Sequence, residues 1–469
     1  MKSFRSTLIL LLLAALVGGY IYYAERGPIA ESGSTVLLRT DPNVVSSLRL
    51  SQAGGKTVLL QKSGESWTVQ QGQTATAVPA DPDTVKGLLD QVQLVQSQNV
   101  VSNESARLKE YGLDKPQSSL TVTDTKIEFG AKPKFDSSKI YARVADQVAL
   151  LPATLSDAVT KPFNDWRDKA VLRVKLEETS RLALKAPAVT AALEQTKEKT
   201  ETESSEWKIA QPVDAVADAS TVESFINQLS AAQAAKFLED NPKSPAKWGL
   251  DKPQAQVEIT TKDGARKLLV GKRLKDGYAA QNTFSPVVFQ LPEATFGLIN
   301  RPLRDWRSKT VLKFEMADLT QVEVTARGTT RTYTKKDDKW KAVNATAGDA
   351  DATNQAVLDL LIAAQSLSAQ DFIDKSGSPS TYAFDKPGVL LKLTSARQPG
   401  PLTLQLGFPG TKAYARSGTG DNFEPTVYVL PASAKESFKS ALDKLFAPPP
   451  PTPAAAPSLP SATPAANKP

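Results

Sequence analysis

A six-residue segment that occurs three times constrains the fold of this chain more than any other feature of its sequence. Each copy has an aromatic residue, two small or apolar residues and then Asp-Lys-Pro; the copies are Tyr111–Pro116, Trp248–Pro253 and Tyr382–Pro387. Their starts lie 137 and then 134 residues apart. This interval exceeds the roughly 20–50 residues of a solenoid repeat and matches the size of a small domain. The sequence therefore predicts three folded modules in series.

The predicted modules cover residues 35–170, 171–310 and 311–446 of the 469-residue chain. Each begins with short alternating strands separated by turns, continues with a helix whose apolar residues recur at i, i+3, i+4 and i+7, and ends with further strands. Strands joined by short turns favour antiparallel pairing. The predicted fold class is α+β: three tandem modules of mainly antiparallel sheet, each with one or two packed helices, after one N-terminal transmembrane helix.

Two kinds of residue recur in the first half of each module. A tryptophan lies in an early strand, where its burial would contribute about 2–3 kcal/mol. An aspartate precedes the helix, where its carboxylate can accept hydrogen bonds from free backbone N–H groups. The tryptophans are Trp67, Trp207 and Trp340, and the aspartates are Asp81, Asp218 and Asp351. Both sets are interpreted as structural.

The repeated loop motif supplies the candidate interaction residues. Proline is tolerated at the start of a strand, so the motif is predicted to lead a loop into the second half of each sheet. Gly112 and Gly249 are expected where a side chain is unfavourable, although Ala383 stands at the third position. The motif's aspartates are the best candidates for functional carboxylates, but a loop aspartate commonly accepts bonds from nearby N–H groups, and we expect that role here. The candidate set is Tyr111, Asp114, Pro116, Trp248, Asp251, Pro253, Tyr382, Asp385 and Pro387.

A second motif closes the first two modules only. Trp166-Arg167 and Trp306-Arg307 each precede a further module, and the third module ends without an equivalent. A motif present only where another module follows indicates a module junction, with the tryptophan buried and the arginine paired across the junction. On this basis Trp306→Ala is expected to loosen the second module against the third without unfolding either.

The composition excludes several classes of active site. The chain has no Cys and no His, which excludes disulfides, a thiolate nucleophile, a Ser-His-Asp triad and the common zinc sites. Its net charge of +7 is small for its length and its charges are interspersed, so a nucleic-acid partner is not expected. Catalysis would have to rest on carboxylates, Lys, Tyr or Ser-Lys pairs. Because no set of residues in the sequence requires an activity, we expect no catalytic residues, no metal, no cofactor and no enzymatic activity.

The amino terminus has the pattern of a membrane anchor. Residues 1–5 carry positive charge, residues 6–24 are uncharged and apolar, and 25–34 form a linker. Nineteen residues at about 1.5 Å each give about 28 Å, close to the roughly 30 Å of a bilayer core. The preceding positive charge places the amino terminus in the cytoplasm and the modules outside the cell (inner) membrane. A cleaved signal peptide is the alternative. Residues 447–469, rich in Pro and Ala, are expected to be disordered.

Taken in order, these motifs resemble the domain-of-unknown-function family 4340 over residues 36–446. The resemblance implies a membrane-anchored periplasmic or other extracytoplasmic protein, often encoded with gliding-type ABC transporter components, and it carries over no catalytic residues. The third copy departs from the pattern by having Ala383-Phe384 for Gly-Leu and by lacking Trp-Arg.

Three functions are consistent with the sequence. The leading hypothesis is a non-enzymatic accessory or scaffold subunit of a membrane-protein complex, such as an ABC-type transporter. The first alternative is a protein that binds cell-envelope polysaccharide or peptidoglycan on exposed Tyr141, Tyr278 and Tyr414. The second alternative is a hydrolase, which would need two carboxyl groups roughly 5–10 Å apart in a cleft.

Overall fold

The computed structural model describes residues 34–97, 100–101, 107–198, 200, 204–343 and 350–446. The predicted anchor at 6–24 and the predicted disordered tail at 447–469 lie outside these residues. Within the described ranges, no helix combines the length and the apolar character needed to cross a membrane. The anchor therefore stays a prediction.

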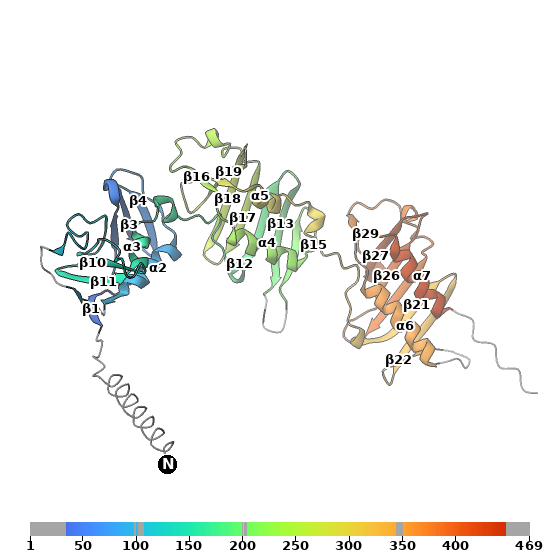
Figure 1. Cartoon of the computed structure of the whole chain (residues 1–469). Coiled ribbons are helices and arrows are strands. Elements are labelled where there is room, and N and C mark those ends of the chain that lie inside the picture. The colour runs from blue at the N-terminus through green and yellow to red at the C-terminus, as the bar shows by residue number, and fades with distance from the viewer. Residues whose placement is uncertain are drawn as a thin grey trace, which may run out of the picture. The chain divides into compact units, whose positions relative to one another are not determined.

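The structure confirms an α+β fold with three antiparallel sheets and packed helices (Figure 1). The first sheet has the strand order β5-β4-β3-β2-β8-β9-β10-β11-β7. Its elements are β2 (Ser47–Ser51), β3 (Thr57–Ser63), β4 (Ser66–Gln71), β5 (Val78–Pro79), α2 (Pro82–Gln93), β7 (Val100–Val101), β8 (Ser118–Val122), β9 (Thr125–Phe129), β10 (Lys139–Val144), β11 (Gln147–Pro152) and α3 (Ala153–Val159). Two further strands, β1 (Thr35–Arg39) and β6 (Leu94–Ser97), pair with each other.

The second sheet repeats this order as β15-β14-β13-β12-β17-β18-β19-β20-β16. Its elements are β12 (Thr179–Ala186), β13 (Val189–Lys197), β14 (Glu206–Gln211), β15 (Ala215–Val216), α4 (Ala219–Ala231), β16 (Lys236–Glu239), β17 (Ala255–Thr261), β18 (Gly264–Leu274), β19 (Gly277–Asn282), β20 (Val288–Leu291) and α5 (Glu293–Ile299).

The third sheet has the order β23-β22-β21-β25-β26-β27-β29-β24, and β28 pairs with β27. Its elements are β21 (Leu319–Ala326), β22 (Thr329–Lys336), β23 (Lys339–Ala342), α6 (Ala350–Gln365), β24 (Asp371–Ile373), β25 (Val389–Ser395), β26 (Leu402–Gly407), β27 (Ala413–Thr419), β28 (Asn422–Phe423), β29 (Val427–Leu430) and α7 (Ser433–Leu445).

All three sheets are built from two meanders that meet at the centre. Within each sheet, the first strand in sequence pairs with the strand that follows the loop motif, as in β2–β8 and β21–β25. In the second and third modules, the short strand after the main helix crosses to the far edge and pairs with the last strand, as in β16–β20 and β24–β29. In the first module, β7 pairs with the last strand, and β6, which directly follows α2, pairs with β1. In the second and third modules, a phenylalanine of this edge strand packs on the arginine of the preceding module.

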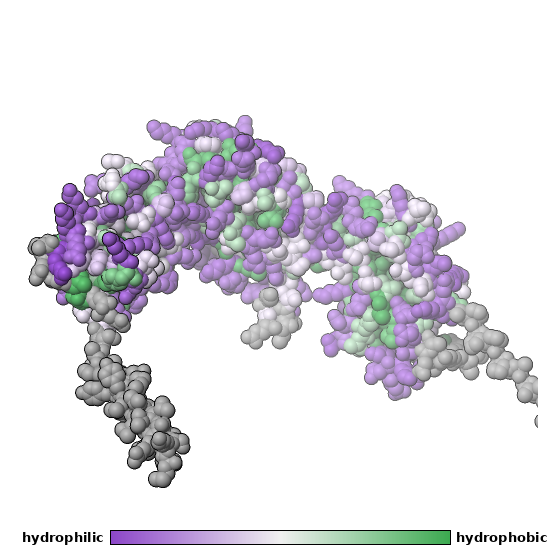
Figure 2. Space-filling model, in the orientation of Figure 1, coloured by the Kyte–Doolittle hydropathy of each residue, from purple (hydrophilic) through white to green (hydrophobic). Residues whose placement is uncertain are grey.

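The helices cover one face of each sheet because their apolar residues recur with the helical period. In the third module, α6 and α7 lie side by side and share one hydrophobic core with the strands (Figure 1). The buried helix positions match the expected set in all three modules: Val85, Leu88, Leu89, Val92, Val222, Phe225, Ile226, Leu229, Val357, Leu360, Leu361 and Ala364. The strand tryptophans Trp67, Trp207 and Trp340 are also buried. Hydrophilic residues predominate on the face seen in Figure 2, with hydrophobic residues scattered among them.

The expected helix caps of the first two modules are present. The carboxylate of Asp81 accepts a hydrogen bond from Thr84 N at 2.8 Å, and that of Asp218 accepts one from Thr221 N at 2.9 Å. In the third module, α6 begins at Ala350, so Asp351 lies in its first turn, at the helix amino terminus where the sequence places a negative charge.

The chain divides into two compact units, and each of the two junctions lies within one of them. The described residues of Met1–Thr179, Lys185–Pro187 and Ile226–Ile299 form one unit, and those of Ser180–Leu184, Ala188–Phe225 and Asn300–Pro469 form the other.

Replacing Asp218 with Ala is expected to destabilise the start of α4 by about 1 kcal/mol, because the Thr221 N–H loses its acceptor. Hydrogen exchange of the first-turn amides should then be about fivefold faster. Asp218→Asn, which keeps an acceptor, is the matched control. Equal exchange in wild type and Asp218→Ala would contradict the cap.

The same cap predicts a pH dependence. Burial raises the pKa of Asp218, but hydrogen bonds from Ser220 and Thr221 outweigh it, and the pKa lies below its usual range. A lowered folded-state pKa stabilises the folded state above the unfolded value of about 3.9, and this contribution is lost as pH falls through the folded value. The difference in α4 amide exchange between wild type and Asp218→Ala should therefore disappear as pH falls through the folded-state pKa of Asp218.

Candidate functional site: the module junctions and the repeated loop

The first junction is a short segment that is hydrogen-bonded on both sides. On the side of the first module, Asp81 N donates to Trp166 O at 2.8 Å and Asp168 N donates to Pro79 O at 2.9 Å. On the side of the second, Val171 N donates to Ala232 O at 3.0 Å and Ala234 N donates to Lys169 O at 2.7 Å. The backbone alone therefore fastens this segment to both neighbours.

Arg167 crosses this junction with a side chain that is only 5% exposed. Its guanidinium forms an ion pair with Asp240 and lies 3.7 Å from the centre of the Phe237 ring. Phe237 lies in β16, the edge strand of the second sheet. Burial lowers the pKa of Arg167, and the neighbouring Asp240 acts against that shift by favouring the charged form. A buried guanidinium requires this compensation, since an unpaired buried charge is costly.

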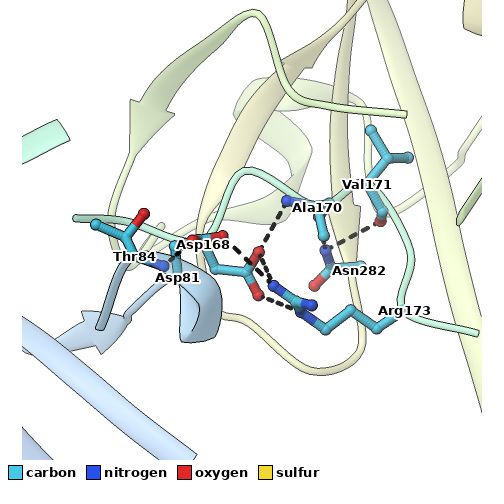
Figure 3. A network of polar contacts seen from close by, with 7 residues as sticks. All are labelled: Asp81, Thr84, Asp168, Ala170, Val171, Arg173 and Asn282. Atoms are coloured by element: carbon cyan, nitrogen blue, oxygen red, sulfur yellow. Dashed lines mark hydrogen bonds and ion pairs between the residues drawn. The ribbon is translucent and has the colours of Figure 1, made fainter. Parts of the chain in front are cut away.

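A polar network surrounds the first junction (Figure 3). Asp168 accepts both Arg173 Nε at 2.7 Å and Arg173 Nη2 at 2.8 Å, and it also accepts the Ala170 N–H at 2.8 Å. Asn282 of β19 donates to Val171 O at 3.1 Å. Two parallel hydrogen bonds between a guanidinium and a carboxylate fix the relative orientation of the two side chains as well as their distance. The network therefore orients the segment as it enters the second module.

The second junction repeats the arrangement of the first. Arg307 is 5% exposed and donates to both carboxylate oxygens of Asp374, at 2.7 and 2.9 Å. Its guanidinium lies 3.9 Å from the centre of the Phe372 ring, and Phe372 lies in the edge strand β24. The backbone bonds also recur: Asp218 N donates to Trp306 O, and Ala369 N donates to Lys309 O. At both junctions, therefore, an arginine of one module contacts a phenylalanine and an aspartate of the next.

The receiving half of each junction, a phenylalanine followed by an aspartate, could not be inferred from the motifs alone. Phe237 lies opposite Phe289 and Phe372 lies opposite Tyr428; the corresponding residue in the first module, opposite Ala149, is Val100. The first module thus lacks the phenylalanine, as the third lacks Trp-Arg. One sequence signal could have identified these residues. Phe237-x-x-Asp240 begins eleven residues before the loop motif of the second module, Phe372-x-Asp374 begins ten residues before that of the third, and the first module has no such segment there.

Both junction tryptophans belong to the core of the module that they end. Trp166 and Trp306 are each 0% exposed. Trp306 packs edge-on against Phe225 of α4, with ring centres 5.0 Å apart. This burial contradicts the expectation that Trp306→Ala would leave the second module intact, because truncating a core aromatic leaves a cavity inside that module.

The loop motif packs on the sheet face opposite the helices. In each module, the aromatic residue and the apolar residue two positions later belong to a small hydrophobic cluster that is separate from the main core. The motif residues buried in these clusters are Tyr111 and Leu113 in the first module, Leu250 in the second, and Tyr382 and Phe384 in the third. The aromatic residue's carbonyl comes so close to the sheet that a Cβ on Gly271 would lie 2.1 Å from Trp248 O.

The residue after the aromatic one adopts a left-handed backbone in every copy, as expected. The φ angles are +67° at Gly112, +70° at Gly249 and +58° at Ala383. Glycine reaches this region without steric cost and alanine does so with strain. This position of the motif therefore has the same left-handed conformation in all three modules.

The aspartates of the motif do not have the structural role that we expected for them. Asp114, Asp251 and Asp385 are exposed, and so are the lysines that follow them. Within the part of the chain that the structure describes, no hydrogen bond or ion pair engages these six side chains, which are Asp114, Lys115, Asp251, Lys252, Asp385 and Lys386. The prolines Pro116, Pro253 and Pro387 are half-buried. The expectation of bonding to nearby backbone N–H groups is therefore wrong.

The three tyrosines of the sugar-binding alternative do not line one surface. Tyr141 packs on Tyr111 and Tyr414 packs on Tyr382, with ring centres 4.5 and 5.1 Å apart. Tyr278 is buried and stacks instead on Phe296 of α5, on the helix side of its sheet. The residue in register with Tyr141 and Tyr414 is Ala279, because a one-residue offset in a strand reverses the face. The geometry gives this alternative no support.

The sheets and junctions define a class of protein: tandem α+β modules of one topology, linked by buried arginines. The chain belongs to the family described as "Domain of unknown function (DUF4340)", which it matches over residues 71–206 and 207–387, more than half of its length. Each match spans one junction. No curated protein matches the chain.

Solved structures give only weak similarity. The β subunit of DNA polymerase III from Pseudomonas aeruginosa aligns at 10% identity over 84% of this chain and 93% of that chain, with a TM-score of 0.14. A DNA polymerase sliding clamp from the same organism, with ligand, aligns at 8% identity over the same shares, also with a TM-score of 0.14. Scores this low carry no argument about fold or function.

Replacing Arg307 with Met is expected to weaken the second junction by about 1–3 kcal/mol, because Asp374 loses a charged hydrogen-bond partner. Hydrogen exchange at β24 should accelerate, while exchange at α4 stays unchanged. Arg304→Met is the matched control, since Arg304 is 57% exposed and lies 3.9 Å from Asp371. An exposed pair of this kind contributes little. Equal effects of the two variants would contradict the junction.

Replacing Trp306 with Ala is expected to cost about 3–5 kcal/mol in the second module itself. Exchange protection should fall across α4 and the strands beneath it. Trp306→Phe, which keeps an aromatic ring against Phe225, should lose less. Retention of full α4 protection in Trp306→Ala would show that the side chain serves the junction alone.

Proposed function

We propose that this chain is a membrane-anchored extracytoplasmic scaffold, a non-enzymatic accessory subunit of a membrane-protein complex of the ABC-transporter type. The observation that carries the proposal is the repeated junction. In the second and third modules, a phenylalanine in the edge strand and the aspartate that directly follows this strand receive the arginine of the module before.

Such a junction suits a protein whose task is to present surfaces in a set order. The aspartate and the aromatic ring offset the cost of burying the guanidinium, and backbone hydrogen bonds on both sides of the segment hold the closed junction together. Modules held in order place their weak contacts at a high effective concentration for a common partner. A chain of independent modules on flexible linkers would need no buried charge between them.

The membrane side of the proposal rests on the sequence. Residues 6–24 have the length and composition of an anchor, and the positive charge before them directs the modules out of the cytoplasm. The choice of partner rests on the resemblance to the family, whose members are often encoded with gliding-type ABC transporter components.

Crosslinking of the full-length chain in its native membrane, followed by identification of the captured proteins, tests this function. We expect subunits of a membrane complex to be recovered, and the yield to fall several-fold in the double variant Arg167→Met, Arg307→Met. Arg304→Met is the control with an intact junction. Recovery of lipid and polysaccharide alone would contradict the proposal.

A further inference from the structure

We propose that the exposed Asp-Lys pair of each repeated loop is a docking element for a partner protein that presents a basic group opposite the aspartate and an acidic group opposite the lysine. The pairs are Asp114-Lys115, Asp251-Lys252 and Asp385-Lys386. The inference rests on the proposed function, since it names the surface through which the scaffold meets its partner.

The pattern of variation within the motif supports this inference. The positions that pack on the sheet differ among the copies: the aromatic residue is Tyr, Trp or Tyr, the next is Gly, Gly or Ala, and the third is Leu, Leu or Phe. The exposed positions are Asp and Lys every time. Packing tolerates these changes of size, whereas identical exposed residues indicate a constraint that lies outside the module.

The fold itself makes no use of these side chains. The six of them are exposed and have no polar partner among the described residues. The loop backbone is fixed by other means, namely the buried residues on either side of the left-handed position and the proline after the lysine. Removing the charges should therefore leave each module folded.

The order of charges restricts the chemical class of the partner. A polyanion, such as a nucleic acid or an anionic lipid surface, would attract the lysine and repel the aspartate equally. A protein surface can place both signs within one contact, and complementary charges give orientation and register. The loop backbone is fixed before binding, so little conformational entropy is lost when a partner docks.

Three equivalent loops also suit a weak individual contact. An exposed ion pair is worth only about 0–1 kcal/mol. Three such elements on linked modules add through effective concentration, which makes binding strong only when several loops engage together. Loss of one loop should accordingly have a small effect and loss of all three a large one.

The test uses a zero-length carbodiimide, which joins a carboxylate to an amine only when the two are in contact. The full-length chain is treated in its native membrane, and crosslinked peptides are identified by mass spectrometry. We expect peptides that join the loop residues to lysines or acidic residues of a different protein. Their yield should fall as ionic strength rises, because salt screens exposed charges.

Three variants supply the matched comparison. Asp251→Asn with Lys252→Gln should lower the yield of partner crosslinks about two- to threefold, and the same change in all three loops at least about tenfold. Lys275→Gln with Asp276→Asn removes an exposed pair from the turn between β18 and β19 of the same module and should leave the yield unchanged.

The outcomes separate this inference from the proposed function. Partner capture that survives neutralisation of all three loops would overturn the docking role and leave the scaffold intact. Failure of the wild-type chain to capture any protein would overturn the scaffold and the docking role together. Crosslinks that join only two copies of this chain would overturn the partner assignment. A fall of more than about 5 °C in the unfolding temperature of the neutralised variant would show a structural role for the charges instead.

Discussion

A guanidinium group buried between consecutive modules is the constraint on which the organisation of this chain depends. Arg167 and Arg307 are each 5% exposed, and removing a charge from water costs several kcal/mol unless it is paired. In both cases the compensation comes from the following module, whose edge strand supplies an aromatic face and whose next residue supplies a carboxylate. Backbone hydrogen bonds already fasten the link to both neighbours, and the buried charge adds a contact that requires the ring and the carboxylate of the following module.

The junctions are also coupled to the interior of the modules. Asp81 caps α2 with its carboxylate and donates its own N–H to Trp166 O, and Asp218 does the same for α4 and Trp306. The start of each helix, the core tryptophan and the junction backbone therefore share one aspartate. Because the core that holds the tryptophan also positions the next residue, damage to the module interior should reach the junction.

Local patterns in the sequence predicted the helices, their buried faces and the strand tryptophans, because these depend on the period of a single segment. The partners Phe237 and Asp240 could not be predicted, since they depend on which edge strand lies beside the arginine in space. The face of Tyr278 was mispredicted because one residue of offset reverses a strand's sides. The lack of a hydrogen-bond partner for Asp114 among the described residues could not be predicted either, since the sequence does not distinguish a loop aspartate that bonds to the backbone from one that does not.

The claim that the junction holds consecutive modules in one arrangement is tested most directly by measuring the distance between two spin labels with pulsed electron–electron double resonance. The chain has no native Cys, so cysteines placed at exposed Glu65 and Asp263, in the first and second modules, would carry the labels alone. A closed first junction predicts a narrow distance distribution that broadens when Asp240 is changed to Ala. A distribution that is already broad in the otherwise wild-type chain, and that Asp240→Ala leaves unchanged, would contradict the account.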